Sequence, residues 1–499
     1  MVKTSLKVKL LHIETGSISI VVLNSEQAKD LDLKHLDRVR VYNHKKSIIC
    51  SVDITRVAVK RGEIGLFVEP EIHLGFKDGD ELLIESVPKP KGLSAIREKL
   101  DGKELNKEDL YDIVKNIVDD ELSDVELTAF ITASYCKGLS FEETYNLTKA
   151  MVETGEVLNF GKGPVFDKHS IGGVPGNRVT MVLIPIVASQ GIKIPKTSSR
   201  AITSPSGTAD TVEVLCPVTL SKEKIKSIVD KFNGCMVWGG SFNLAPADDK
   251  IIRVEKPLSI DAEGQMLASI LAKKISVGSN HIIIDLPIGP GTKLPTHEKS
   301  EHLTEMFVNL GKKLGVKIEC IESNGSQPCG NGVGPALEAI DVLKILTNDP
   351  TQPRDLREKS LIFAAKIFEM SGIVRKGKGM ELASKILDSG QAYIHFKKII
   401  KAQGGNPNVK ISDIKVGSFV YEYKSDSKGV ITMINNKAIA EVARAAGAPY
   451  NKGAGVFVKS KLSELINEND TLMVIHSESR EKLLRAIEVL KDRKIFTVQ

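Results

Sequence analysis

Alternating apolar and polar residues open the chain and predict β-strands. Over residues 1–86, short runs of this kind are separated by turn-forming residues. Residues 31–41 (LDLKHLDRVRV) and 74–84 (LGFKDGDELLI) match in pattern, so this segment contains an internal repeat. Two such halves predict a small closed β-barrel with pseudo-twofold symmetry, similar to double-psi barrels. Its sequence holds no cluster of catalytic residue types, and we therefore expect the barrel to serve in assembly.

Helical periodicity replaces the alternation after a linker rich in proline and lysine at residues 87–92. Apolar residues then recur at helical spacing, with Asp, Asn or Ser at the starts of the segments. The four segments of this kind are 93–100, 106–118, 123–136 and 140–154. They predict a helical subdomain over residues 92–160, which we expect a later segment at about 246–278 to complete.

Strand-like and helical segments alternate over residues 161–245 and 279–408. This order is typical of a mostly parallel sheet covered by helices. Strands return from about residue 410 and predict a C-terminal β-rich α+β domain over 409–499. The predicted fold class is therefore a multidomain α/β protein with a barrel, a helical subdomain, a large α/β domain and a C-terminal domain.

Composition narrows the class of function. The 499 residues are 41% hydrophobic and 26% charged, as in ordinary soluble proteins. No apolar run approaches the roughly 20 residues needed to span a bilayer, and no signal peptide opens the chain, so we expect a cytoplasmic protein. The net charge of +6 is spread over dispersed lysines with few aromatic residues, which fits small anionic substrates better than nucleic acid. The six cysteines lack metal-like spacing, and we expect buried thiols and no metal site.

The first candidate site lies at residues 167–178 (DKHSIGGVPGNR). The apolar run 163–166 before it predicts a strand, and the run 179–188 after it predicts a helix. A strand, a glycine-bearing loop and a helix N-terminus together suit an anion, because glycine lets the backbone approach and free N–H groups point at the ligand. Lys168 adds a positive charge and Ser170 a hydroxyl donor. Taken alone, an ordinary tight turn explains this segment equally well.

A second polar loop favours the anion site over a simple turn. Residues 197–210 (TSSRAITSPSGTAD) contain seven hydroxyl residues and one arginine, Arg200, between two apolar runs. A solvated surface loop can also be rich in serine, but it rarely lies between two predicted strands. The two loops together predict a phosphate or sugar-phosphate site.

Asp261, Ser269 and Lys273 are spaced by multiples of four in a segment compatible with a helix. Such spacing drifts by only about 120° round the helix from first to last, so the three side chains can face one cleft. Asp261 is also a residue type that caps helices, and capping is compatible with a catalytic role.

A loop rich in glycine and proline at residues 287–293 follows the predicted strand 281–286 and ends on Lys293. Open parallel sheets bind ligands at the carboxyl ends of their strands. Lys293 is therefore a candidate contact for an anionic substrate, and an ordinary surface lysine is the alternative.

Several of these motifs together resemble the thymidine and pyrimidine nucleoside phosphorylase family. The matching segments are KHSIGGV at 168–174, SSR at 198–200, GTAD at 207–210, NLAPAD at 243–248, ASILAKK at 268–274 and QPCGNGVGPALE at 327–338. The resemblance covers about residues 90–499. The family usually has TGGT where this chain has TSPSGT at 203–208. That departure and the additional N-terminal segment resemble an archaeal branch of the family that acts on AMP, and they argue against thymidine as the substrate.

The resemblance implies phosphorolysis of a nucleotide: AMP and inorganic phosphate give adenine and ribose 1,5-bisphosphate, with CMP and UMP open as further substrates. It implies that Asp261 is the general acid to the leaving base, which requires a protonated and therefore buried carboxyl. The implied phosphate-binding residues are Lys168, Ser170, Ser198 and Lys273. The implied AMP-binding residues are Gly173, Ser199, Arg200, Ala201, Ile202, Thr203, Ser204, Thr208, Ser269 and Lys293. No cofactor or metal is implied, and the implied assembly is a homo-oligomer of dimers joined by the N-terminal barrel.

Three other functions remain open from the sequence. A pyrimidine nucleoside phosphorylase would use the same phosphate loop without a grip on a 5′-phosphate. A phosphoribosyltransferase resembling the anthranilate enzyme would need a metal and diphosphate chemistry, for which the sequence has no obvious paired-acid motif. A non-catalytic binding protein would leave the hydroxyl-rich loop and Asp261 without a role.

Overall fold

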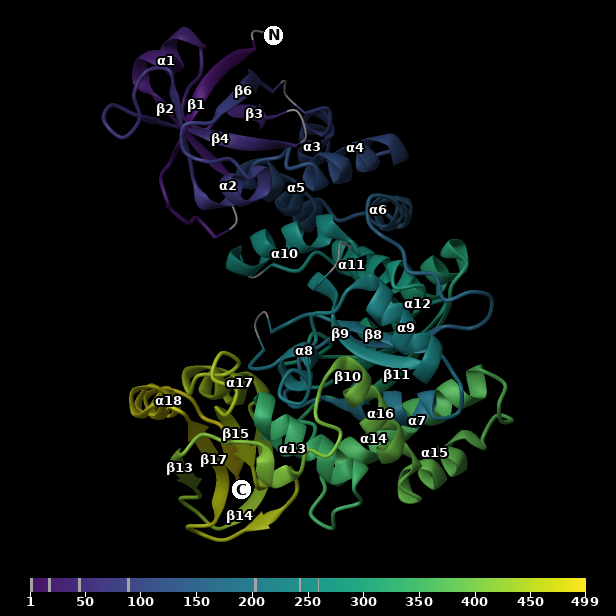
Figure 1. Ribbon diagram of the computed structural model, residues 1–499. Helices are drawn as coiled ribbons and strands as arrows, with labels where there is room; N and C mark the ends of the chain where they lie inside the picture. The colour runs from purple at the N-terminus through teal and green to yellow at the C-terminus, as the bar shows by residue number, and fades with distance from the viewer. Residues whose placement is uncertain are drawn as a thin grey trace. The chain divides into compact units, whose positions relative to one another are not determined.

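The computed structural model describes residues 3–16, 19–43, 46–87, 90–201, 204–241, 244–258 and 260–499 (Figure 1). The chain forms two compact units, Met1–Leu139 and Ser140–Gln499. This division falls inside the segment 92–160 that the sequence predicts as one helical subdomain. The boundaries of the four predicted domains therefore stay a prediction. In the described residues, no helix combines the length and the apolar character that a membrane span requires.

The first unit begins with a closed six-stranded barrel, in the order β1-β5-β2-β4-β3-β6. Its elements are β1 (Thr4–Leu10), β2 (Ile20–Asn24), α1 (Ser25–Asp30), β3 (Arg38–Tyr42), β4 (Ser47–Thr55), β5 (Glu63–Leu66), α2 (Val68–Leu74) and β6 (Glu81–Ser86). The pairing is symmetric: β1 lies parallel to β5 and antiparallel to β6, as β4 lies parallel to β2 and antiparallel to β3. The predicted N-terminal barrel is confirmed.

Three helices follow the barrel in the same unit: α3 (Gly92–Leu100), α4 (Lys107–Val118) and α5 (Asp124–Lys137). The starts of α4 and α5 are fixed by reciprocal caps, Asn106 with Asp109 and Ser123 with Glu126, which satisfy backbone N–H groups of the first turn. Arg38 of the barrel lies 3.3 Å from Glu126, so the same glutamate also ties α5 to strand β3.

The second unit contains two groups of parallel strands. Strand β10 (His281–Ile288) pairs in parallel with β7 (Phe166–Ser170) and with β11 (Lys317–Asn324). Strand β8 (Ile194–Ser198) pairs in parallel with β9 (Gly234–Trp238). The helices of this region are α6 (Phe141–Glu153), α7 (Val179–Ala188), α8 (Thr208–Val212), α9 (Lys222–Phe232), α10 (Pro246–Leu258), α11 (Glu263–Ser276), α12 (His297–Leu314), α13 (Pro335–Leu346), α14 (Arg354–Met370), α15 (Gly379–Asp388) and α16 (Gln391–Gln403).

The expected strand at 163–166 is displaced along the chain. The observed strand β7 begins at Phe166, so the segment Asp167–Ser170 lies in the sheet and not in the loop after it. Backbone pairing with β10 explains the difference, because Asp167, Lys168 and Ser170 each have a register partner on that strand. The polar side chains of this segment consequently start from a rigid strand.

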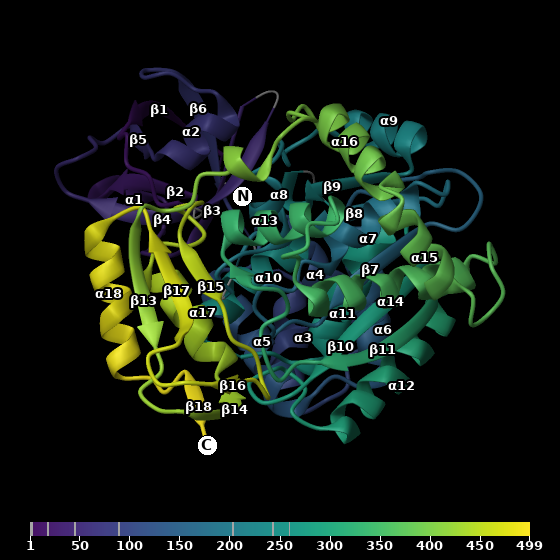
Figure 2. The ribbon, with the colours of Figure 1, turned by 90° about the horizontal axis from the view of Figure 1, so that it is seen from below.

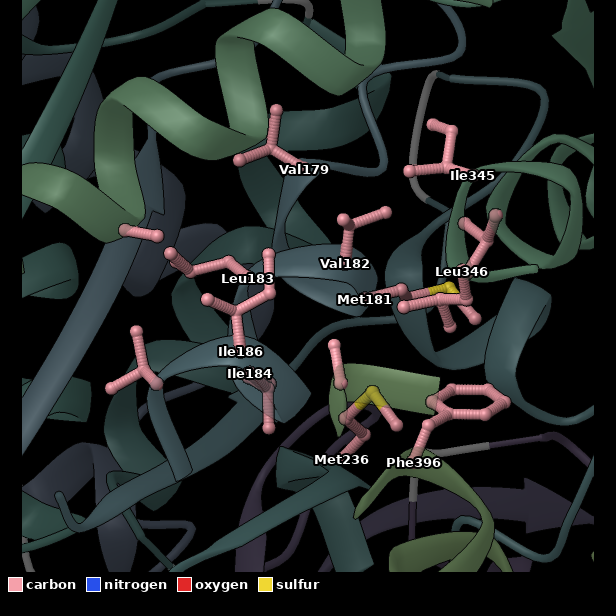
Figure 3. Close-up of a cluster of buried hydrophobic side chains, with 14 of the residues drawn as sticks. Val179, Met181, Val182, Leu183, Ile184, Ile186, Met236, Ile345, Leu346 and Phe396 are labelled. Carbon is pink, nitrogen blue, oxygen red and sulfur yellow. The ribbon is translucent and has the colours of Figure 1, made fainter. Parts of the chain in front are cut away.

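Helix α7 is the centre of the large hydrophobic core of the second unit. All ten of its residues (VTMVLIPIVA) are buried, as expected for a helix that is apolar on every side. Figure 3 shows Val179, Val182 and Ile186 among the side chains of this core, which also includes Met236 and Phe396. Because packing fixes α7, it also fixes the end of the glycine-bearing loop that leads into the helix.

The C-terminal region consists of two small antiparallel sheets with helices against them (Figure 2). Its elements are β13 (Phe419–Lys424), β14 (Gly429–Ile434), α17 (Asn436–Ala445), β15 (Gly455–Val458), β16 (Leu465–Ile466), β17 (Thr471–Ser477), α18 (Arg480–Lys491) and β18 (Phe496–Val498). The short strand β12 (Gly332–Val333) joins one of these sheets by pairing with β15. This pairing ties the C-terminal sheet to the segment that leads into α13.

Candidate active site

Lys168 lies on strand β7, and its side chain forms a buried ion pair with Asp285. The Nζ–Oδ2 distance is 2.8 Å, and the two side chains are 2% and 0% exposed. Lys359 lies 3.1 Å from the same oxygen, and Ser323 donates a hydrogen bond of 2.5 Å to Oδ1. Burial opposes the charged carboxylate, but Lys168 and Lys359 outweigh it and hold the pKa of Asp285 below its usual range. The lysine expected to hold phosphate thus has a carboxylate partner in this structure.

A second buried carboxylate, Asp167, holds two more lysines. Lys196 and Lys274 lie 3.1 and 2.7 Å from its two oxygens. Burial lowers the pKa of Lys274 to about 7 against the opposing charge of Asp167. Burial, followed by Lys274 and Lys196, also lowers the pKa of His169 well below its ordinary value. The imidazole of His169 is therefore neutral at physiological pH.

Arg178 joins the two polar loops. Its Nε lies 2.6 Å from Oε2 of Glu338, and its Nη2 donates to the carbonyl oxygen of Ser206 at 2.5 Å. Thr211 donates to the same Glu338 carboxylate at 2.5 Å. Since Arg178 and Glu338 are both buried, a largely buried network holds the end of the first loop and the turn of the second together.

Arg200 orders the second loop. Its guanidinium donates two hydrogen bonds, of 2.7 and 2.6 Å, to the carboxylate of Glu213 and lies over the ring of Trp238. The bond to Arg200 is the main reason that the pKa of Glu213 is lowered to about 2. Asp210 accepts hydrogen bonds from the backbone N–H groups of Ala201 and Gly207 at 2.7 and 2.9 Å. The loop is thus closed on itself.

The remaining predicted residues of the second loop lie around this turn. Ser198 ends strand β8 and is half-buried, and Ser199 is exposed. Ser204 donates to the carbonyl oxygen of Ser206 at 3.0 Å, and Thr208 begins helix α8. Ile202 and Thr203, both predicted to bind AMP, lie outside the described residues.

Gly173 brings the first loop against the loop that carries Lys293. Its φ of +93° is a conformation that favours glycine. A Cβ atom at this position would lie 2.8 Å from Cα of Thr292 and 3.1 Å from the backbone nitrogen of Lys293. Only glycine permits this approach, which places the end of β7 and the end of β10 side by side. Ser170 lies at the same end and accepts a hydrogen bond of 3.3 Å from Asn177.

Asp261 and Lys293 are in direct contact, with Nζ of Lys293 donating to Oδ2 of Asp261. Asp261 differs from the prediction in two respects. Asp261 precedes α11, which begins at Glu263 with Ala262 as its extended N-cap, so Asp261 neither lies in the helix nor caps it. Its side chain is also 44% exposed and not buried. The spacing of four therefore holds only for Ser269 and Lys273, which are both on α11.

Lys273 forms ion pairs with two aspartates in the first turn of α10. Its Nζ lies 2.5 Å from Oδ2 of Asp248 and 3.3 Å from Oδ1 of Asp249. Burial acts to lower the pKa of Lys273, but the two carboxylates outweigh it and the net shift is upward. Ser269 is half-buried one helical turn before Lys273. Like Lys168, Lys273 is therefore paired with a carboxylate in this structure.

Sequence reasoning missed Glu255. This residue lies seven positions after Asp248 in α10, so the two carboxyl groups share a helix face. Burial, then the charges of Asp248 and Asp261, raise the pKa of Glu255 to about 7, while Lys293 and Lys273 oppose the shift. A glutamate in a helix is usually solvated, and only its spacing from Asp248 could have indicated this environment.

Three segments of the chain match known protein families. The helical bundle domain of a glycosyl transferase family matches residues 93–155, and the a/b domain of the same family matches residues 162–393. The C-terminal domain of pyrimidine nucleoside phosphorylases matches residues 430–495. The fold and the domain order thus define a glycosyl transferase of the nucleoside phosphorylase class.

Curated relatives narrow the class. AMP phosphorylase 1 of Archaeoglobus fulgidus is 45% identical over 478 residues, which cover 96% of this chain and 94% of that protein. AMP phosphorylase of Methanococcoides burtonii is 42% identical over 494 residues, covering 99% and 97%. The chain belongs to the AMP phosphorylase family, and the predicted resemblance is confirmed.

Solved structures resemble about three-fifths of the chain in fold. Anthranilate phosphoribosyltransferase of Thermus thermophilus covers 62% of this chain and 99% of its own, with a TM-score of 0.53 and 18% identity. The enzyme of Saccharomyces cerevisiae gives a TM-score of 0.52, also at 18% identity, and covers 63% and 98%. At this identity the likeness concerns the fold alone.

Proposed function

We propose that this chain catalyses the phosphorolysis of AMP, giving adenine and ribose 1,5-bisphosphate. The observation that carries the proposal is the similarity to AMP phosphorylases over nearly the whole of both chains. The alternative of a pyrimidine nucleoside phosphorylase is not favoured. The match named for that class covers residues 430–495, whereas the relatives that match over nearly the whole chain are named AMP phosphorylase. CMP and UMP are proposed as further substrates of the same site.

The reaction moves C1′ of the ribose from a base nitrogen to a phosphate oxygen. The bond from C1′ to the base breaks with its electron pair going to the base, while an oxygen of inorganic phosphate forms the new bond to C1′. The base must gain a proton as it leaves, and positive charge develops on the sugar between the two steps. A site for this chemistry needs a held phosphate, a proton donor and a grip on the 5′-phosphate of AMP.

Asp261 is the proposed proton donor, and Lys293 is the proposed contact of the 5′-phosphate. In the structure these two groups are bonded to each other. A phosphate monoester carries about 1.5 to 2 negative charges near neutral pH, which makes it a stronger partner for a lysine than a single carboxylate. An AMP phosphate that takes Lys293 would therefore release the carboxyl of Asp261 from its ion pair. Substrate binding would thus make this carboxyl available to the leaving base.

The attacking phosphate is proposed to bind at Lys168, Ser170, Ser198 and Lys273. The buried lysines on Asp167 and Asp285 support this placement. Even with Lys274 neutral, the three other lysines of these two clusters outnumber the two aspartates. The surplus positive charge suits an anion at the end of β7. The proposed AMP-binding residues are Gly173, Ser199, Arg200, Ala201, Ser204, Thr208 and Ser269, with Ile202 and Thr203 of the same loop.

We also propose that the chain works as a cytoplasmic homo-oligomer. In this proposal the helical subdomain forms dimers, and the N-terminal barrel joins the dimers into a larger particle. The barrel has its own closed core around Val21, Val39 and Ile64, and the proposed site residues all come from the second unit. Assembly is therefore the role that we propose for the barrel.

Product analysis tests the proposed reaction. AMP, CMP, UMP and thymidine are each incubated with the full-length protein, with and without inorganic phosphate, and the free bases are separated by chromatography. We expect adenine from AMP only when phosphate is present, together with a stoichiometric sugar bisphosphate. Adenine release without phosphate would indicate a hydrolase, and release of thymine from thymidine would indicate a nucleoside phosphorylase.

A further inference from the structure

A cavity of about 750 Å³ lies between the second polar loop and the C-terminal helices α17 and α18. One wall is formed by Arg200, Ala201 and Ser204 of the loop, and the other by residues from the end of α17 to the middle of α18. Arg200, Ala201 and Ser204 are among the residues proposed to bind AMP, whereas none of the residues proposed for phosphate binding or proton transfer lines the cavity. The cavity therefore adjoins the proposed AMP site on the side of this loop.

The acidic groups in the cavity wall are already matched by cations. Glu213 lies 2.6 Å from Arg200 and 2.9 Å from Lys452, and Asp210 lies 3.6 Å from Lys452. Two carboxylates therefore face two cations. Any further basic side chain in this cavity adds uncompensated positive charge.

Three further basic side chains line the cavity: Arg444 in the last turn of α17, and Lys482 and Arg485 on α18. Lys482 donates to the neutral Oδ1 of Asn451 at 2.5 Å. In the described part of the chain, the guanidinium groups of Arg444 and Arg485 have no hydrogen-bond or ion-pair partner. Like charges that share a cavity repel one another, and an anion bound between them would relieve that cost.

The size of the cavity and one aromatic side chain indicate more than inorganic phosphate. Ligand sites for small organic molecules measure about 300–1,000 Å³, far more than a single phosphate ion fills. Tyr450 also lines the cavity and is 94% exposed. An exposed tyrosine ring offers a face on which a nucleobase can stack.

We propose that this cavity binds a nucleoside di- or triphosphate, beside the proposed AMP site and in addition to AMP. Arg444, Lys482 and Arg485 contact the phosphates, and Tyr450 stacks on the base. Three uncompensated cations match the charge of a polyphosphate better than that of AMP. Coupling to catalysis rests on the proposed function: Arg200 and Ser204 line the cavity and also belong to the loop proposed to bind AMP, so an occupant changes the apparent affinity for AMP.

The test uses the full-length protein, ATP as the probe and saturating AMP without inorganic phosphate. Under these conditions AMP fills its own site and cannot be phosphorolysed, so calorimetric titration with ATP reports other sites. We expect one ATP per chain for the natural protein. The double variant Arg444→Glu, Arg485→Glu should bind ATP at least about 10-fold more weakly, because charge-assisted contacts are lost. Lys491→Glu, a single charge reversal on α18 outside the cavity, should bind like the natural protein.

Further measurements separate the possible failures. The double variant should retain AMP phosphorolysis without ATP, which shows that it is folded. No ATP binding beside AMP, or equal binding to the double variant, would overturn the proposed site. Pyrophosphate binding as tightly as ATP, together with no effect of Tyr450→Ala, would overturn the assignment to a nucleotide. ATP binding that depends on Arg444 and Arg485 in a protein without phosphorolysis would leave this site standing and reject the proposed reaction.

Discussion

Nζ of Lys293 is bonded to Oδ2 of Asp261, a residue 32 positions earlier in the chain. The lysine ends the loop after strand β10, and the aspartate precedes helix α11. These are the two residues proposed to hold the 5′-phosphate of AMP and to protonate the leaving base. Their contact means that the grip on the substrate and the acid are not independent parts of the site.

Replacing Asp261 tests the proton donor. Asp261→Asn keeps the shape of the side chain and its ability to bond to neighbours but cannot donate an acidic proton. We expect turnover to fall about 100-fold or more, since general acid catalysis typically contributes about 10²–10⁴. The apparent affinity for AMP should change little. Steady-state kinetics with AMP and phosphate provide the measurement, and near-normal turnover would remove Asp261 from the mechanism.

His169 serves as the internal comparison for that experiment. Its lowered pKa leaves the imidazole neutral at physiological pH, so it carries no acidic proton to give. His169→Gln should therefore cost less turnover than Asp261→Asn under the same assay conditions. The opposite ranking would make His169 the better candidate for the acid.

Replacing Lys293 tests the contact with AMP. A lost hydrogen bond to a charged group costs about 1.5–3 kcal/mol, which corresponds to roughly a 10- to 100-fold rise in KM for AMP in Lys293→Ala. KM for inorganic phosphate should change much less. Lys299→Ala, a change at an exposed lysine of α12, is the matched control. An equal rise in both constants would place Lys293 on the attacking phosphate or in a structural role.

The buried ion pair of Arg178 and Glu338 should matter for stability. Arg178→Met leaves a fully buried carboxylate without its cation, and such a loss typically costs about 3–5 kcal/mol in the free energy of unfolding. Arg357→Ala removes an arginine that pairs with the half-exposed Asp388 at 2.5 Å, and a surface pair of this kind contributes only about 0–1 kcal/mol. Denaturant unfolding of the two variants should rank them in this order. Similar losses would mean that the Arg178 network does not hold the two loops.

Glu255 should make stability depend on pH. Its pKa rises from 4.5 in the unfolded chain to about 7 in the folded chain, because of burial and then of Asp248 and Asp261. The folded state therefore binds the proton more tightly, and the stability contributed by this group is complete below pH 4.5 and is lost as the pH rises through about 7. Glu255→Gln should remove this part of the decrease in Tm across the window. Glu358→Gln, at an exposed position of α14, should follow the natural protein.

Removal of residues 1–86 tests the assembly role of the barrel. The proposed catalytic residues lie in the second unit, so phosphorolysis of AMP at moderate temperature should be retained. Light scattering should show a smaller particle than for the full chain. An unchanged particle mass would reject the assembly role, and a folded but inactive product would indicate that the barrel contributes to the active site.

The local pattern of the sequence was enough to predict much of the fold. The apolar run at 179–188 became the buried helix α7 with the expected bounds, and the capping sequence at Ser123 became the start of α5. The internal repeat became a barrel with symmetric pairing. These features are readable because helical period, caps and strand alternation depend on residues close in sequence. The family motifs were likewise contiguous in the chain.

The tertiary structure alone decided which charges meet. Lys168 was predicted for phosphate, yet its partner Asp285 is 117 positions away and is selected by the pairing of β7 with β10. Asp261 lies outside the expected helix because the backbone is extended at Ala262, and its side chain contacts Lys293 of another loop. Ion pairs and burial depend on strand order and on the packing of distant elements, which periodicity along the chain does not encode.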